Sequence, residues 1–313
     1  MMLNDTAQQA LLAPAAGRRE RRRRSGLSAG ASALVMLVPA VALCTTFIVI
    51  PAILAIVGSL HAFRVTSADW TFVGLGNYAT IATDPIFWLA LRNNIIIVVG
   101  SIVLQVGFGT VLAAILDRGI PYGSTVFRTI IFAPVVVSTI AVALIWLIIY
   151  DPNIGILNAI VRGVGLSPPT AGWLGHPDYA IWMLLIVAAW HFTGFIMVLM
   201  LAGLQSIPKE LYEAASLDNA RGIRAFWHVT LPSIRNILIV AVLITTIGGF
   251  KVFDLIYATT LGGPGNATQV LGTYVYLQAF TLGNMGIANA ISVILLLIAV
   301  VLGILQLRAS RRA

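Results

Sequence analysis

The sequence predicts an all-α integral membrane protein with six transmembrane helices. Of its 313 residues, 59% are apolar and 10% are charged, against about 25% charged residues in an average soluble domain. Six segments of about 20 or more residues are nearly free of charge, which is the length that a helix needs to cross about 30 Å of hydrocarbon. This composition excludes an ordinary water-soluble globule.

The six predicted spans cover residues 33–60, 94–116, 129–150, 181–204, 237–256 and 287–307. The first follows a cluster of arginines, as a signal peptide would. Its apolar run is much longer than the ~7 to 15 residues of a cleaved signal peptide, so we expect it to stay in the chain. Residues 1–30 are predicted to be a basic, disordered cytoplasmic tail, and residues 31–313 the six-span domain.

The net charge of +8 comes from 19 Lys and Arg against 11 Asp and Glu. With six alternating spans and an inner N-terminus, 15 basic residues fall in inner segments, whereas the outer loops hold Arg64, Arg92 and Arg162. The positive-inside rule then predicts that both termini are cytoplasmic. We expect the basic tail to contact anionic membrane lipid, and we predict no nucleic-acid partner.

The sequence lacks the signatures of catalysis. It has no Gly-x-x-x-x-Gly-Lys-Ser/Thr sequence, so it has no phosphate-binding loop for ATP. The four histidines lack metal-ligand spacing, and Cys44 has no partner for an intrachain disulfide. We therefore predict no catalytic residues, no metal site and no bound cofactor. His191, inside the fourth span, suits a structural or pore-lining role better than catalysis.

The longest inner loop, residues 205–236, carries signals for two short helices. Ser206 is expected to cap the first helix, Pro208 suits its first turn, and Glu210 favours its positive end. Asn219 tolerates the left-handed conformation that a sharp reversal needs. A second short helix is predicted over residues 223–229, before Pro232.

In this loop, Glu213-Ala214-Ala215 followed by Val229-Thr230-Leu231-Pro232 resembles the "EAA" signature of permease subunits from binding-protein-dependent ABC importers. In that family the motif forms a coupling helix that docks into a groove on the cytoplasmic ATPase. The resemblance assigns ATPase coupling to Glu213, Ala214, Ala215, Asp218, Asn219, Ala220, Leu231 and Pro232. Asn219 stands where glycine is customary, and Val229 where isoleucine is common. The alternative is an amphipathic loop helix that rests on the inner leaflet.

Two further segments resemble the carbohydrate-importer branch, of the maltose and glycerol-phosphate type. Residues 72–78, Phe-Val-Gly-Leu-Gly-Asn-Tyr, match its "GLxNY" element. Residues 253–257, Phe-Asp-Leu-Ile-Tyr, then Thr260, residues 261–264 and Thr268, with Tyr274, Tyr276 and Ala279-Phe280, match its "FD-x-IY" to "AF" stretch. From residue 255 to residue 307 the chain has no charged residue.

The resemblance implies the six-span fold of ABC type I importer permeases in the bacterial inner membrane. It further implies a second homologous permease subunit, two cytoplasmic ATPase subunits that bind ATP and Mg, and an extracytoplasmic solute-binding protein. The chain itself is then not an enzyme, and it forms half of the pathway for a sugar-like solute. Alternatives are another solute, such as glycerol phosphate, a polyamine or a peptide, or an ion-coupled secondary transporter. The last of these usually needs more intramembrane acids than Asp254.

The fifth span holds the candidate solute contacts. Gly248-Gly249 is expected to interrupt this helix, which is tolerated where the backbone faces protein or a watery cavity. Lys251 and Asp254 would share a face, either as an interfacial ion pair or as cavity-lining groups. The predicted substrate pathway comprises Thr245, Thr246, Gly248, Gly249, Lys251, Asp254 and His191.

Overall fold

The computed structural model describes residues 29–64, 66, 69–117 and 123–311, so most of the predicted basic tail lies outside the described residues. The chain divides into two units, Met1–Ala52 and Ile53–Ala313. In the first unit, α1 (Ala29–Cys44) passes through a π-helical turn, Thr45–Val49, into the start of α2 (Ile50–Ser59), which belongs to the second unit from Ile53 onward. The continuous helix from Leu37 to Ser59 is long and apolar enough to cross a membrane.

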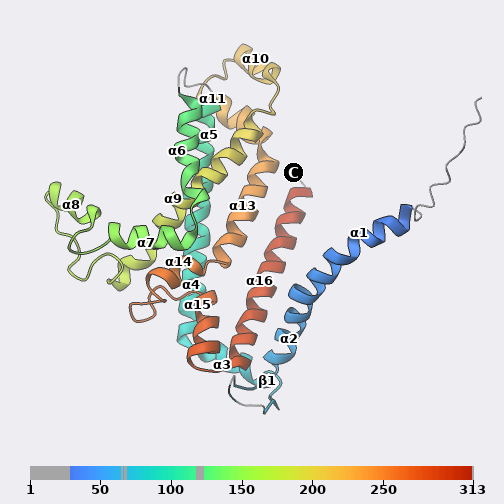
Figure 1. Cartoon of the computed structure of the whole chain (residues 1–313). Coiled ribbons are helices and arrows are strands. Elements are labelled where there is room, and N and C mark those ends of the chain that lie inside the picture. The colour runs from blue at the N-terminus through green and yellow to red at the C-terminus, as the bar shows by residue number, and fades with distance from the viewer. Residues whose placement is uncertain (1–28, 65, 67–68, 118–122, 312–313) are drawn as a thin grey trace, which may run out of the picture. The chain divides into compact units, whose positions relative to one another are not determined.

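The second unit contains the rest of the described elements (Figure 1). A short antiparallel hairpin pairs β1 (His61–Ala62) with β2 (Thr71–Phe72). The helices of its first half are α3 (Gly76–Thr83), α4 (Pro85–Ser101), α5 (Phe108–Asp117), α6 (Ser124–Val136), α7 (Thr139–Ile149), α8 (Ile156–Gly163) and α9 (Pro177–Leu204). Those of its second half are α10 (Lys209–Leu217), α11 (Ile223–Ala225), α12 (Leu231–Ser233), α13 (Arg235–Phe250), α14 (Asp254–Thr259), α15 (Leu271–Tyr276) and α16 (Met285–Arg311). This unit also has three π-helical turns. Ile102–Gly107 joins α4 to α5, Phe226–Thr230 joins α11 to α12, and Leu277–Thr281 follows α15.

The prediction of an all-α, multi-span protein is confirmed. Among the described residues, four helices can cross a membrane by length and composition, and six spans result if each of two bent helix pairs counts as one. The second span is a 33-residue rod from Pro85 to Asp117, so it begins earlier than predicted. The third span is the pair α6 and α7, and the fifth is the pair Ile223–Ser233 and Arg235–Phe250, which is bent by 73°.

The predicted third span is not a single continuous helix. It is bent by 101° between α6 and α7. Val137 and Ser138 are extended, and the Ser138 Oγ accepts a hydrogen bond from the Ala141 amide at 3.3 Å, which starts a new helix. The His191 Nε2 donates to the Val137 carbonyl at 3.1 Å. The break therefore has local partners for its backbone, as a helix end inside a membrane requires.

The fifth span also breaks at a different place from the one predicted. Helix α13 continues through Gly248 and Gly249 to Phe250, and the irregular segment is Lys251 to Phe253. A Cβ at Gly249 would lie 2.7 Å from the Val98 Cγ2 and 3.1 Å from its Cα. The absent side chain thus permits close packing of α13 against α4, in the way that small residues bring membrane helices together.

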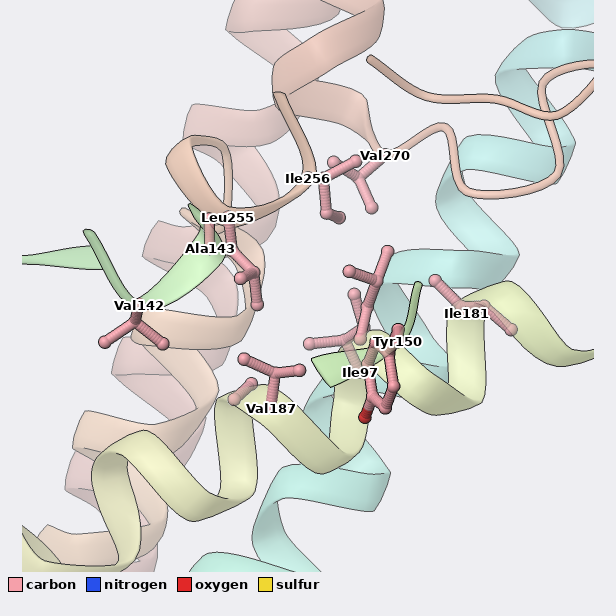
Figure 2. Packing of buried hydrophobic residues seen from close by; sticks show 11 residues of the cluster. Ile97, Val142, Ala143, Tyr150, Ile181, Val187, Leu255, Ile256 and Val270 are labelled. Atoms are coloured by element: carbon pink, nitrogen blue, oxygen red, sulfur yellow. The ribbon is translucent and has the colours of Figure 1, made fainter. Parts of the chain in front are cut away.

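The core of the second unit is built around α9, the most buried of the candidate spans. One buried cluster joins side chains of α4, α7, α9 and α14 (Figure 2). Among them, Val142 of α7, Val187 of α9 and Ile256 of α14 are fully buried. Helix α9 also crosses α6 closely, because a Cβ at Gly194 of α9 would lie 2.2 Å from the Ile131 carbonyl oxygen of α6.

The "GLxNY" element fastens the end of α2 to α3. The Asn77 Nδ2 donates to the carbonyl oxygens of Ser59 at 2.8 Å and His61 at 3.0 Å, and the Tyr78 hydroxyl donates to the Ser59 Oγ at 2.8 Å. Asn77 and Ser59 are both buried. Carbonyl groups at the end of a helix lack intrahelical donors, and Asn77 supplies them here.

Candidate translocation cavity and coupling surface

A cavity of about 240 Å³ lies where the end of α13 meets α4 and α9. Its walls are mainly apolar and aromatic, with a few polar groups, which is typical of small-molecule sites. The lining comes from four parts of the chain: α4 with the π-helical turn after it, α7, α9, and the segment from α13 to α14. The lining residues, in chain order, are Ile97, Ser101, Gln105, Thr139, Ala188, Phe192, Phe195, Ile196, Ile244, Thr245, Gly248, Gly249, Lys251, Val252, Phe253, Asp254 and Leu255.

The cavity brings together most of the predicted pathway residues, namely Thr245, Gly248, Gly249, Lys251 and Asp254. Two others lie elsewhere. The Thr246 Oγ1 donates to the Val242 carbonyl at 2.7 Å and accepts from the Gln306 Nε2 of α16 at 3.3 Å. The His191 ring, as described above, bonds the end of α6. Thr245 and Thr246 are adjacent on a helix, so their side chains point in different directions. Residue type alone could not tell which of the two lines the cavity.

Three polar residues of the lining are candidate ligand contacts, one of them buried and two exposed. The Thr245 side chain is 5% exposed, and its buried Oγ1 has no hydrogen-bond partner. Such a group is costly to leave unpaired. Lys251 and Asp254 are exposed and form no ion pair with each other. The wall next to them is open as well, because a Cβ at Gly248 would meet no atom within 4 Å.

Asn94 of α4 holds the irregular part of the fifth span in place. Its side chain is fully buried. The Nδ2 donates to the Gly249 carbonyl at 3.0 Å, near the end of α13, and the Oδ1 accepts from the Leu271 amide at 2.8 Å, at the start of α15. One amide therefore caps two helix ends that lack intrahelical partners. Sequence reasoning missed this residue, although a pair of asparagines at the start of an apolar span was a visible signal.

The neighbouring Asn93 binds the loop between α14 and α15. Its Nδ2 donates to the carbonyl oxygens of Ala267 at 2.9 Å and Gln269 at 2.8 Å. Inside the loop, Thr260 and Thr268 share a hydrogen bond of 2.7 Å between their hydroxyls, and the Thr268 Oγ1 is also 2.6 Å from the Gly263 carbonyl oxygen. The uncharged loop is thus folded onto α4.

The predicted coupling helix is α10, which begins after Pro208. Asn219 has a φ of +58°, so the predicted left-handed conformation is confirmed. The Ala220 amide donates to the Ala215 carbonyl at 2.9 Å, and the Asn219 amide to the Ser216 carbonyl at 3.2 Å. This pair of bonds is the Schellman motif, in which Gly or Asn ends a helix.

The predicted cap at Ser206 is wrong. Its Oγ donates backward to the Gly203 carbonyl at 2.7 Å, so it closes the end of α9 and leaves α10 without a side-chain cap. The predicted second helix also continues beyond residue 229. It runs from Ile223 through a π-helical turn to Ser233, because Pro232 lies in the first turn of α12, where a missing amide donor costs nothing.

Among the predicted coupling residues, Glu213, Ala214, Asp218, Asn219 and Pro232 are exposed, and Ala215, Ala220 and Leu231 are half-buried. The structure adds two residues that sequence reasoning missed. Leu217 is 85% exposed and Ile223 is 78% exposed. Exposed charged residues, Asp218, Arg221 and Arg224, lie close to them in the sequence, and exposed apolar side chains of this kind are typical of protein interfaces. A hydrogen bond of 3.0 Å between the hydroxyls of Tyr212 and Thr230 links α10 to the turn before α12.

The cavity and the predicted coupling residues belong to different parts of the second unit. Helices α10 and α11 lie at one end of the helical bundle, whereas α3, α15 and β1 lie at the opposite end (Figure 1). The cavity is next to α14, between these ends. A change at α10 therefore has to pass along α9 or α13 to reach the cavity.

Most of the chain is similar to known membrane transport proteins. Residues 105–313 match the model of a family described as "Binding-protein-dependent transport system inner membrane component". The chain is 41% identical over 275 residues to the probable ABC transporter permease protein YurN of Bacillus subtilis, with 88% of this chain and 94% of YurN covered. It is 34% identical over 277 residues to the trehalose/maltose transport system permease protein MalF of Thermococcus litoralis, with 88% and 92% covered.

The fold is also that of a solved importer. A crystal structure of a bacterial ABC transporter involved in the import of the acidic polysaccharide alginate contains a chain that superposes with a TM-score of 0.78 at 22% identity, covering 90% of this chain and 95% of that one. Together with the apolar helices, these matches make the protein a multi-pass permease subunit of the bacterial inner membrane. The chain therefore belongs to the family of inner-membrane components of binding-protein-dependent transport systems.

Proposed function

We propose that this chain forms half of the translocation pathway of an ATP-driven importer for a sugar or a related hydroxylated solute. The observation that carries the solute class is the cavity at the break of the fifth span. It offers an unpaired hydroxyl on Thr245, a cation on Lys251 and an anion on Asp254 beside apolar walls. A sugar presents donors, acceptors and apolar C–H faces together, so it suits such a site. The named trehalose/maltose relative supports the same class.

The charges near the cavity favour a neutral solute over a charged one. Lys251 and Asp254 balance each other, and residues 255–307 contain no charge at all. A phosphate ester is usually held by several cationic or backbone donors, and a polyamine needs several carboxylates. Neither set is present in the lining.

The coupling surface around α10 is proposed to dock the ATPase subunits, which would bind ATP and Mg. We define this surface by the predicted coupling residues together with Leu217 and Ile223. Closure of the ATPases on ATP would move α10, and the Tyr212–Thr230 hydrogen bond would pass that motion toward α13. Such a switch requires the ATPases to bind this loop differently in their two states.

The remaining partners and the orientation follow from the same arrangement. The coupling end carries Lys209, Arg221, Arg224 and Arg235, so we place that end and both termini in the cytoplasm. The open wall at Gly248 is then left for a second permease subunit and the solute. An extracytoplasmic binding protein would deliver the solute at the opposite end.

The solute class is tested first with the cognate binding protein. The purified protein is titrated calorimetrically with maltose, trehalose, lactose, glycerol 3-phosphate, spermidine and a dipeptide mixture. We expect tight binding of a sugar and ATP-dependent uptake of the same sugar by the complete importer in proteoliposomes. Binding and uptake restricted to the phosphate ester, the polyamine or the peptides would contradict the assignment to sugar.

The cavity is tested with Gly248→Leu, which adds a side chain where no atom of this chain interferes. It should fill part of the cavity and lower uptake at least tenfold while the importer assembles normally. Gly107→Leu is the matched control, because a Cβ there also meets no atom within 4 Å, and Gly107 lies outside the cavity lining. Lys251→Met should weaken uptake as well. Uptake kinetics unchanged in both Gly248→Leu and Lys251→Met would rule out this cavity as the pathway.

A further inference from the structure

Four aromatic side chains form a continuous row that no step above uses. The ring centroids of Phe253 and Tyr257 are 5.1 Å apart, those of Tyr257 and Tyr276 are 4.8 Å apart, and those of Tyr276 and Phe280 are 5.1 Å apart. We call these four residues the aromatic row. They come from two segments, one at the start of α14 and one in α15 and the turn after it. Both segments lie in the second unit.

The row connects the cavity with the surface. Phe253 lines the cavity, whereas Phe280 is 66% exposed. Tyr257 and Tyr276 between them are half-buried. Because α15 lies at the end of the bundle opposite to α10, the row runs from the cavity toward the end that the proposed function assigns to the extracytoplasmic side (Figure 1).

Hydrogen bonds hold the row and the segments that carry it in place. The Tyr257 hydroxyl donates to the Tyr276 hydroxyl at 3.1 Å. The loop between the two segments is closed by the Thr260–Thr268 hydrogen bond and tied to α4 by Asn93, and Asn94 caps the start of α15. Rings fixed in this way lose little further freedom when a ligand contacts them, which favours binding.

Packing alone does not account for the exposed end. Phe87, an aromatic residue of the neighbouring core cluster, is 5% exposed, as expected of a ring that serves only to fill space. Phe280 instead leaves most of its surface uncovered, although its ring is in contact with Tyr276. Aromatic faces carry partial negative charge and the C–H bonds of a sugar ring carry partial positive charge, so a pyranose can lie flat on such a ring.

We propose that the aromatic row is a binding path on which sugar rings move from the docked binding protein into the cavity. This proposal rests on the proposed sugar import. Each contact along the row is weak and lacks a charge, so a ring can pass from one aromatic side chain to the next without being trapped. Phe280 is the receiving end and Phe253 is the delivering end.

The test uses the complete importer in proteoliposomes with the labelled disaccharide of the panel above that the wild-type complex imports. Phe280→Leu removes the ring but keeps an apolar side chain, and Phe280→Trp retains an aromatic face. We expect Phe280→Leu to lower the uptake rate roughly two- to tenfold, the equivalent of one aromatic contact. The number of ATP molecules hydrolysed per sugar should rise, because the binding protein still docks. Phe280→Trp should remain close to wild type.

Trp88→Leu is the matched control, since Trp88 is 54% exposed and lies outside the row. Its uptake should match wild type. The proposal is overturned if Phe280→Leu keeps the wild-type rate and ATP ratio, or if Trp88→Leu loses as much activity, as an interfacial anchoring role would predict. A wild-type complex that imports no sugar would instead refute the proposed function, so the two failures are distinguishable.

Discussion

Replacing Asn94 with leucine should destabilise the permease and distort the cavity. Leucine has the same number and branching of side-chain heavy atoms as asparagine, although it is bulkier, and it can form no hydrogen bond. The Gly249 carbonyl and the Leu271 amide would both lose their partner, at 3.0 and 2.8 Å in the native protein. Both groups sit at helix ends, where no intrahelical partner can replace the lost one.

The magnitude follows from these two orphaned groups. A buried donor or acceptor left unpaired costs about 1–3 kcal/mol, so the pair would cost about 2–6 kcal/mol. Hydrogen bonds between membrane helices are worth less on average, about 0.6 kcal/mol, because the unfolded reference state finds other partners. Since Asn94 is fully buried and its partners are backbone groups, we expect a loss of at least about 2 kcal/mol.

The assay is unfolding of the purified permease in mixed detergent and SDS micelles, followed by tryptophan fluorescence. Arg92→Leu is the control, because Arg92 is exposed two residues earlier on the same helix. It should change the free energy of unfolding by less than about 0.5 kcal/mol. If Asn94→Leu unfolds like Arg92→Leu, then Asn94 does not hold the two helix ends.

Substitutions at four further residues test the coupling surface and the packing. Leu217→Asp and Glu213→Lys should each abolish sugar-dependent ATP hydrolysis in the reconstituted complex, while the permease stays in the membrane. Normal sugar-dependent hydrolysis in both variants would contradict the proposed docking surface. Asn219→Val should destabilise the end of α10 by about 1–2 kcal/mol, because valine disfavours the left-handed conformation, whereas Asn219→Gly should be nearly neutral. The measurement is the sensitivity of the loop to protease. Equal sensitivity of the two variants would argue against the left-handed turn. Gly194→Leu should prevent accumulation of folded protein, because its Cβ meets the backbone of α6, and a normal yield on size-exclusion chromatography would count against that contact.

The sequence predicted the membrane class and the turn of the coupling loop because both depend on local properties. Apolar runs need only be long enough to span the membrane, and the left-handed conformation of Asn219 is a preference of a single residue. The helical continuity of the third span did not follow from the sequence. A run without charge between residues 129 and 150 looks the same whether the helix is straight or bent by 101°.

The finer features of the site depend on contacts between distant segments. Asn94 and Leu271 meet across 177 positions of the chain, and the aromatic row joins two segments that a loop folds together. Gly249 was expected to break its helix, yet it serves the packing of Val98 against α13. Thr245 and Thr246 are identical in type, and only their orientation on α13 assigns one to the cavity.

The bend between α6 and α7 leaves the straight part of the third span shorter than the hydrocarbon layer is thick. Helix α6 has 13 residues and α13 has 16, so by helix rise they extend over about 20 Å and about 24 Å. The hydrocarbon layer is about 30 Å thick. Hydrophobic mismatch of this kind is relieved by local thinning of the bilayer or by covering protein. Helices α6 and α13 alone therefore do not extend over the full hydrocarbon thickness, whereas the 33-residue helix from Pro85 to Asp117 does.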